Sequence, residues 1–516
     1  MRNKLIVLTA ALASLASAAL QEPIAVDGGQ IAGTPVPLWT PGVRLFRGIP
    51  YAAPPVGNLR WRAPEPVIPW KGIRAADHFS PVCMQAPTVQ DGTAWQEGLI
   101  PVSEDCLYLN VWTPAPSGSD KLPVMVFIHG GGNTRGAASE LQYDGTFLAK
   151  KGVVYVSMNY RMNVFGFLAH PDLTKESAHG SSGNYALLDQ IAALQWVRRN
   201  IAKFGGDPGN VMVFGHSAGA SNVVSLLASP LAKGLFQRAA VQSGGMAAGT
   251  PLAEAEKAGV QFAQAAGARS IAQLRARPAQ EVLNASKARM GPVVDGWVLP
   301  QAVYKIFESG RQNDVPLIVG FVADDAPGQS PPTKSAELVA YARQTFGALA
   351  DEFLKAFPAT TDAEAAKSSH EFPRMRALAN ARALVTLQTK AGKSKAYWYF
   401  FSHVPPPPPG LLMGGRPAAE LGAYHGGELV YIWNNLHLKD WPWTDADRRL
   451  GGVVSSMWTQ FAKSGDPNGP GLPQWPAYGS GNSLPLHIKA AAKVGPLPFP
   501  AQKLKVVDEI LARDRR

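Results

Sequence analysis

The feature that most constrains this chain is a serine set between a strand-like run and a helix-like run. Residues 210–227 read NVMVFGHSAGASNVVSLL, so Gly215 and Gly219 stand two residues to either side of Ser217. Glycine lacks a Cβ and lets a strand and a helix pack closely around a strained turn that exposes the serine Oγ. The pattern predicts a nucleophile elbow. An ordinary glycine-containing turn is the alternative, since three fixed letters in five positions recur by chance in a chain with 51 glycines.

A glycine loop after an apolar run offers this serine a chemical partner. Residues 122–133 read LPVMVFIHGGGN, an apolar stretch followed by a backbone almost free of side chains. Exposed backbone N–H groups in such a loop can bind the negative oxygen that forms when a hydroxyl attacks a carbonyl carbon. The segment therefore predicts an oxyanion hole.

An acid and a base follow the serine along the chain. Residues 315–328, VPLIVGFVADDAPG, form an apolar run that ends in two aspartates. Residues 421–433, LGAYHGGELVYIW, place His425 between a tyrosine and two glycines, in a loop expected to enter a helix. The order serine, acid, histidine is expected of α/β-hydrolases and differs from the orders in chymotrypsin and subtilisin. The histidines expected to be structural or exposed instead are His129, His403, His437 and His487.

Apolar runs alternate with helix-like stretches through the middle of the chain. The alternation predicts an α/β fold with a mostly parallel central sheet covered by helices, built as a single domain over residues 19–516. The alanine-rich, helix-like residues 330–393 are expected to form a cap insertion over the entrance. The expected strands are residues 124–128, 153–158, 211–214, 238–242, 317–321 and 396–401.

The first residues predict export. Arg2 and Lys4 precede an apolar stretch, and the small residues 16–18, Ala-Ser-Ala, offer a cleavage site. Together these features are typical of a signal peptide over residues 1–18. The apolar run is too short and too rich in alanine to favour a membrane anchor. We expect a secreted or periplasmic protein without stable membrane insertion.

Charge and cysteine content bear on other classes of function. The formal net charge of +11 is spread along the chain without clustered Lys and Arg, so no nucleic acid is expected as a partner. Cys83 and Cys106 are the two cysteines of the sequence. An even pair in an exported chain favours a disulfide over a metal site, which would need more ligands. The sequence predicts neither a metal nor a cofactor.

Six longer stretches match motifs of one protein family and occur in the same order as in that family. They are FRGIPYAAPPVGNLRWRAPEP from Phe46, EDCLYLNVWTP from Glu104, FIHGGGN from Phe127, FGGDPGNVMVFGHSAG from Phe204, AVQSGG from Ala240 and SMWTQFAKSGDPNG from Ser456. In these stretches the chain resembles the type-B carboxylesterases, a family that also includes the cholinesterases and some lipases. The resemblance covers nearly the whole mature chain. It implies the α/β-hydrolase fold and the hydrolysis of small-molecule carboxylic esters without a cofactor.

The resemblance also implies roles for single residues in a serine hydrolase mechanism. Aligning VGFVADDAPG with the family's acid-acid-glycine pattern implies that Asp325 is the acid of a triad with Ser217 and His425. Asp324 is then expected to be a solvated turn residue. Ser243, in AVQSGG, is expected either to support the triad acid or to cap a turn.

Backbone groups and paired side chains complete the implied site. The N–H groups of Gly131, Gly132 and Ala218 are expected to receive the oxyanion. The resemblance further implies a disulfide between Cys83 and Cys106. It also implies an ion pair between Arg60 and Glu104.

Three positions depart from the family's usual residues. The residue before the nucleophile is His216 where glutamate is usual, the acid is aspartate where glutamate is usual, and Asn133 stands where an aromatic residue is frequent. Trp95 lies near the position where cholinesterases carry a cation-binding tryptophan, but one residue out of register. Without a glutamate beside the serine to attract a cation, neutral esters are expected to be preferred over choline esters.

Two other functions are compatible with the same fold. One is a catalytically silent, cholinesterase-like module that binds or adheres to a partner, which the survival of the serine, acid, histidine and glycine loop disfavours. The other is a lipase that acts on long-chain acylglycerols. The sequence does not distinguish oligomeric states.

Overall fold

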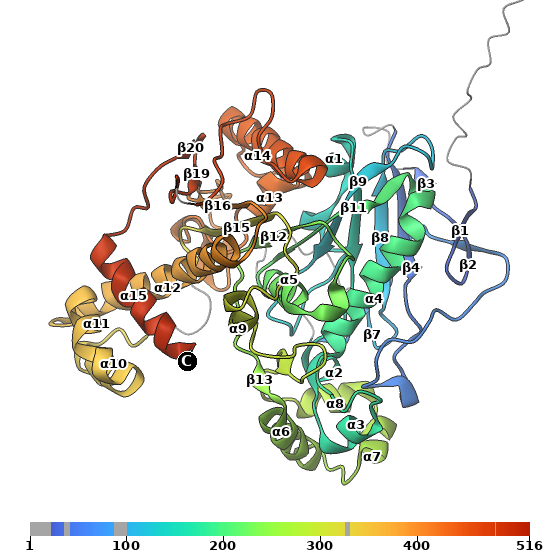
Figure 1. Cartoon of the computed structure of the whole chain (residues 1–516), viewed down its shortest axis with the longest axis horizontal. Coiled ribbons are helices and arrows are strands. Elements are labelled where there is room, and N and C mark those ends of the chain that lie inside the picture. Colours follow the sequence, from blue (N-terminus) through green and yellow to red (C-terminus); the bar gives the residue numbers. More distant parts are fainter. Residues whose placement is uncertain (1–21, 36–41, 87–100, 326–330, 480, 516) are drawn as a thin grey trace, which may run out of the picture.

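An eleven-stranded sheet runs through the centre of the molecule, with helices on both sides (Figure 1). The computed structural model describes residues 22–35, 42–86, 101–325, 331–479 and 481–515. The order of strands across the sheet is β20 (Ala492–Val494), β19 (Leu486–Ile488), β16 (Ala396–Phe401), β15 (Leu317–Val322), β12 (Arg238–Gln242), β11 (Gly206–His216), β9 (Leu122–Ile128), β10 (Val154–Met158), β8 (Tyr108–Thr113), β4 (Arg44–Pro50) and β3 (Thr34–Pro35).

The central strands are parallel and the edges are antiparallel. Every pairing from β19 through β16, β15, β12, β11 and β9 to β10 is parallel. The pairings of β8 with β10, β4 with β8, β3 with β4, and β20 with β19 are antiparallel. All six strands expected from the sequence are present, so the predicted mostly parallel sheet is confirmed. Parallel strands place their carboxyl ends at one edge, where α/β folds bind ligands.

Alternate residues of the strands pack into two separate hydrophobic clusters. Along β9, Val124 and Val126 face one cluster, whereas Met125 and Phe127 face the other, and all four side chains are fully buried. A strand covered on both faces reads as a continuous apolar run, because both of its faces exclude water. Burying each such side chain contributes roughly 1.5–3 kcal/mol. The helices that carry much of the cover are α4 (Tyr185–Asn200) and α5 (Ala218–Ala228) on the first side and α14 (Asp445–Ser464) on the second.

Residues 331–393 contain three α-helices, which lie beside the carboxyl-terminal helix (Figure 1). Thr361 caps the longest of them, because its side chain accepts a hydrogen bond from the backbone N–H of Glu364 at 3.2 Å. This helix packs on β15, β16 and the last helix. That these helices act as a cap stays a prediction. The helices are α10 (Ser335–Phe346), α11 (Ala350–Ala356), α12 (Asp362–Ala391) and α15 (Ala501–Asp514).

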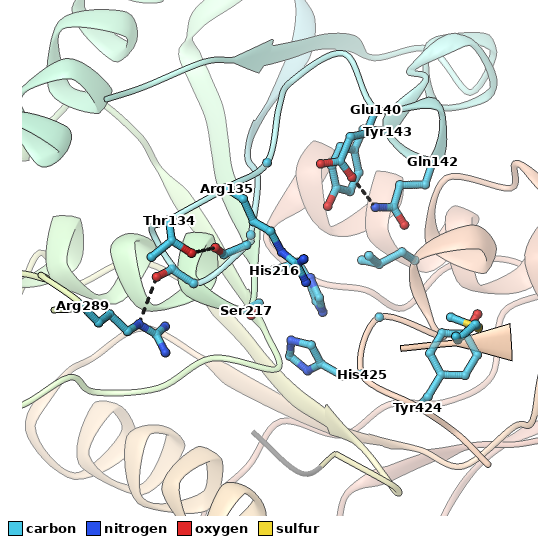
Figure 2. A pocket seen from close by; sticks show the side chains of 17 residues that line it. Thr134, Arg135, Glu140, Gln142, Tyr143, His216, Ser217, Arg289, Tyr424 and His425 are labelled. Atoms are coloured by element: carbon cyan, nitrogen blue, oxygen red, sulfur yellow. Dashed lines mark hydrogen bonds between the residues drawn. The ribbon is translucent and has the colours of Figure 1, made fainter. Parts of the chain in front are cut away.

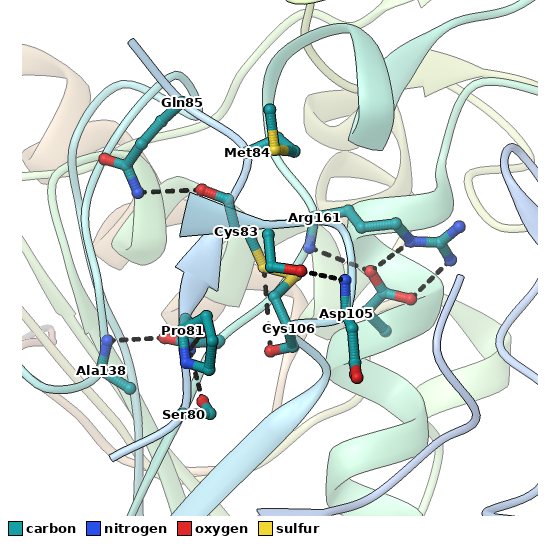
Figure 3. The surroundings of a disulfide bond; sticks show 12 residues. Ser80, Pro81, Cys83, Met84, Gln85, Asp105, Cys106, Ala138 and Arg161 are labelled. Carbon is teal, nitrogen blue, oxygen red and sulfur yellow. Dashed lines mark hydrogen bonds and ion pairs between the residues drawn. A yellow bond between two sulfur atoms is a disulfide. The ribbon is translucent and has the colours of Figure 1, made fainter. Parts of the chain in front are cut away.

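Two covalent and ionic contacts expected from the family resemblance are present. Cys83 and Cys106 form a disulfide (Figure 3). Arg60 binds Glu104 through two parallel hydrogen bonds, each 2.6 Å long. These contacts join Arg60 and Cys83 to the segment just before β8. Trp95, which lies between the two cysteines in sequence, is outside the described residues.

The amino terminus is also beyond what the structure describes. The expected signal peptide, residues 1–18, lies outside the described residues. Within the part of the chain that is described, no helix is both long enough and apolar enough to cross a membrane.

Candidate active site

Ser217 lies at a sharp turn between β11 and α5. Its backbone has φ 57° and ψ −123°, a conformation that non-glycine residues rarely adopt. A Cβ on Gly219 would lie 2.1 Å from the carbonyl oxygen of Ile128, and a Cβ on Gly215 would lie 2.6 Å from the backbone of Gly219. Both glycines are therefore required by close backbone approach. The turn has the geometry predicted for a nucleophile elbow.

The carboxyl edge of the sheet gathers the predicted residues around one cavity (Figure 2). Gly131 and Gly132 follow β9, Ser217 follows β11 and Asp325 follows β15. The cavity has a volume of about 660 Å³, which lies in the range of small-molecule sites. Its walls include the predicted residues Gly131, Gly132, Ser217 and His425, together with Thr134, Arg135, Glu140, Gln142, Tyr143, His216, Arg289, Met413, Tyr424 and Leu429.

His425 joins this cavity to the buried Asp325. Its Nδ1 lies 3.0 Å from Asp325 Oδ1. The carboxylate is 1% exposed, whereas 36% of the imidazole is exposed. Burial lowers the pKa of His425, but the charge and hydrogen bond of Asp325, with a contribution from Glu428, outweigh it, so the pKa is raised. A carboxylate at Nδ1 holds the proton there and leaves Nε2 available as a base.

Asp324 does not have the solvated role expected from the sequence. Its Oδ2 accepts a 2.7 Å hydrogen bond from the backbone N–H of Ala423, two residues before His425. Its Oδ1 forms a 3.0 Å ion pair with Arg374 of α12. The carboxylate is only 25% exposed. Asp324 therefore ties the histidine loop to the end of β15 and to a neighbouring helix, contacts that local sequence gives no sign of.

The glycine loop presents backbone groups rather than side chains to the cavity. Gly131 and Gly132 have φ values of 100° and 67°, which favour glycine. A Cβ on Gly131 would lie 2.0 Å from the carbonyl oxygen of Arg135, so no larger residue fits there. Ala218, the first residue of α5, is 9% exposed. Asn133 is turned inward, where its side chain bonds that of Asn222 at 3.0 Å.

His216 lies beside the expected base, a role that sequence reasoning missed. It is 6% exposed, and its ring centroid lies 4.5 Å from that of His425. Burial, and then the charge of His425, hold the pKa of His216 well below its usual value. His216 therefore remains neutral at neutral pH. The sequence signal for this role was its position directly before Ser217, because that residue ends the strand that leads into the site.

Glu428 is a second residue that sequence reasoning missed. It is 1% exposed. Burial first, and the charge of Asp325 among the other causes, raise the pKa of Glu428 to about 7. The hydroxyl of Ser243 lies 3.5 Å from Glu428 Oε1, so Ser243 contacts this glutamate and not the expected triad acid. The sequence signal for its role was the spacing, because Glu428 is an acid three residues after His425 and directly precedes α13 (Leu429–Ile432).

We expect Glu428→Gln to move the acid limb of the kcat/KM profile to lower pH. Near pH 7, where Glu428 is partly ionised, its charge favours the protonated form of His425, so the substitution lowers the pKa of the base. Ester hydrolysis measured from pH 4 to pH 9 reports this limb, because kcat/KM follows the ionisation of the free enzyme. Glu420→Gln, an exposed acid on the same loop, is the matched control and leaves the profile unchanged. A limb that stays in place or moves to higher pH in Glu428→Gln contradicts the expectation.

The four other histidines named in the sequence analysis do not line the cavity. His129 is buried, stacks on Tyr160 and binds the carbonyl of Gly130, and burial lowers its pKa to about 4. His403 contacts Asp447 at 2.6 Å, His437 packs on Phe147, and His487 binds the carbonyl of Gly495. Their expected structural roles match these contacts.

The sheet order, the elbow after β11 and the cavity at the strand ends together define an α/β-hydrolase. The chain belongs to the carboxylesterase family, whose profile matches residues 21–503. It is an enzyme that hydrolyses carboxylic esters, as the sequence predicted.

Named relatives and solved structures agree with this family. A fumonisin B1 esterase from Sphingopyxis macrogoltabida is 37% identical over 462 residues, which cover 84% of this chain and 82% of the relative. Carboxylesterase 1C from Rattus norvegicus is 34% identical over 523 residues, which cover 92% of this chain and 90% of the relative. The solved structure of a thermophilic PNB esterase is 32% identical and matches with a TM-score of 0.79 over 94% of this chain and 99% of that chain.

Proposed function

We propose that Ser217, His425 and Asp325 form the catalytic triad of this esterase. The observation that carries the proposal is the contact between His425 and a buried aspartate, on the wall of the cavity that Ser217 also lines. His425 removes the proton of Ser217 as the hydroxyl attacks the ester carbonyl carbon, and then delivers it to the leaving alcohol. Water repeats the cycle on the acyl-enzyme and releases the acid. Asp325 holds the imidazole in its working tautomer.

The oxyanion that forms during both attacks is stabilised by backbone donors. We assign this role to the N–H groups of Gly131 and Gly132 in the glycine loop and of Ala218 at the start of α5. Each such donor contributes roughly 3–4 kcal/mol to the transition state. No step of this reaction requires a metal or a cofactor, and that the enzyme needs none stays a prediction.

Covalent labelling of the intact protein tests this proposal. A fluorophosphonate probe is expected to modify Ser217, identified by mass spectrometry of the labelled peptide, and excess ester substrate is expected to slow the labelling. An intact protein that never labels would instead favour the catalytically silent binding module. Activity that rises sharply above the solubility limit of the ester would favour the lipase.

We further propose that the chain is exported and matured near Ala19. The disulfide between Cys83 and Cys106 supports this proposal, because such bonds persist in oxidising compartments. Mass spectrometry of the protein recovered outside the cytoplasm measures the mature terminus. An intact residue 1 in that fraction would exclude cleavage.

A further inference from the structure

One end of the cavity carries a positive charge that the proposed reaction does not use. Arg289 is exposed on the cavity wall, and its Nε donates a 3.1 Å hydrogen bond to the carbonyl of Gly132. A Cβ on Gly132 would lie 2.9 Å from Arg289 Nη2, so the guanidinium rests directly over this glycine. Among the described residues, no carboxylate forms an ion pair with Arg289. Its two Nη groups are therefore available to a ligand.

The other charged groups on the cavity wall do not neutralise this arginine. Glu140 is held by the backbone N–H of Ala137 and by the side chain of Gln142, and Figure 2 shows it at the other end of the cavity. Arg135 also lines the cavity and has partners of its own. His216, directly before Ser217, is neutral, and Glu140 is the one carboxylate among the described residues that line the cavity. The end of the cavity that Arg289 lines therefore favours an anionic substrate group over a cationic one.

The position of Arg289 selects one part of the substrate. Figure 2 shows Arg289 and His425 on opposite sides of Ser217. In the proposed reaction His425 delivers a proton to the leaving alcohol, so the alcohol part of the ester lies on the His425 side. The acyl part then extends from the carbonyl carbon in the other direction, past Gly132 and toward the guanidinium.

We propose that Arg289 binds a free carboxylate on the acyl part of the substrate, so that half-esters of dicarboxylic or polycarboxylic acids are preferred. A guanidinium binds a carboxylate through parallel hydrogen bonds, and its planar shape fixes the direction of the bound group. The inference rests on the proposed triad, because the triad defines which side of the cavity holds the acyl group.

The test compares esters of equal size that differ in charge. Monoethyl succinate, monoethyl glutarate and monoethyl adipate carry a free carboxylate on the acyl part. The matched neutral substrates are the ethyl esters in which this carboxylate is replaced by a primary amide of nearly the same shape. Hydrolysis is followed by acid release in a pH-stat. We expect at least one half-ester to have a kcat/KM roughly tenfold above its amide counterpart, as is typical for a charge-assisted hydrogen bond. The preference decreases as salt is added, because Arg289 is exposed.

Two variants assign the preference to Arg289. Arg289→Gln is expected to reduce the ratio of half-ester to amide kcat/KM to about one, and Arg289→Lys to give an intermediate ratio. Lys287→Gln removes a nearby exposed charge that does not line the cavity, and leaves the ratio unchanged. If Arg289→Gln keeps the half-ester to amide ratio of kcat/KM that the unmodified enzyme has, the proposal is overturned.

The side of the substrate is tested with the acetate ester of 4-hydroxybutyrate, which carries its carboxylate on the alcohol part. No preference over its amide counterpart is expected. A preference for this ester over the half-esters overturns the assignment. If the half-esters and their amide counterparts are hydrolysed with equal kcat/KM and the fluorophosphonate probe still modifies Ser217, only the role of Arg289 fails. If none is hydrolysed and Ser217 does not label, the proposed triad fails with it.

Discussion

Ser217→Ala is expected to lower kcat for p-nitrophenyl butyrate by roughly 10⁶-fold, the loss typical of removing a serine nucleophile. Alanine has the same Cβ as serine, so the strained turn at φ 57° gains no new clash. In the part of the chain that the structure describes, the Ser217 hydroxyl forms no hydrogen bond, and the elbow is set instead by the close approach at Gly215 and Gly219. Release of p-nitrophenol measures the loss, and circular dichroism with thermal unfolding measures the fold.

The matched control is Ser221→Ala, one turn further along α5. Its hydroxyl accepts a hydrogen bond from the backbone N–H of Gly245, so some loss of stability is expected, but fluorophosphonate labelling continues. Ser217→Ala no longer labels. More than a few per cent of activity retained by a pure preparation of Ser217→Ala would mean that another group is the nucleophile.

Asp325→Asn is expected to cut kcat by roughly 10⁴-fold while the protein still folds. The amide cannot hold the proton on His425 Nδ1, so the imidazole loses the tautomer that leaves Nε2 free to act as a base. The loss of the carboxylate also removes the charge that keeps the pKa of His425 raised. Steady-state kinetics at several pH values measure both effects.

Asp324→Asn is the informative comparison, because the two aspartates are adjacent but make different contacts. The asparagine retains an oxygen that can accept the hydrogen bond from Ala423 but loses the charge that pairs with Arg374. We expect a lower melting temperature and a loss of kcat of about tenfold or less, since an ion pair that is partly exposed to solvent contributes little. If Asp324→Asn were the more damaging change for kcat, the acid would be assigned to the wrong residue.

The local features of the site could be predicted because they are written in short segments. The glycines around Ser217 are needed by the backbone of one turn, and the six expected strands are continuous apolar runs because both faces of the sheet are covered. The order of serine, acid and histidine matches the α/β-hydrolase pattern. The carboxyl ends of parallel strands such as β11 and β15 meet at one edge of the sheet, where Ser217 and Asp325 lie. None of these inferences requires knowing which distant residues are neighbours.

The sequence by itself therefore determined the elbow at Ser217, the parallel sheet and the glycine loop, since each depends on backbone geometry within a few residues. Only the tertiary structure decided which side chains surround them. Packing brought Arg289 onto Gly132, 157 positions away in the chain, and placed Glu428 against Ser243. The same packing lets Asp324 accept a hydrogen bond from the histidine loop and pair with Arg374 of α12. Such contacts are set by how helices and loops from distant segments pack on the sheet, and hydrophobic periodicity records which face of a segment is buried but not what lies against it.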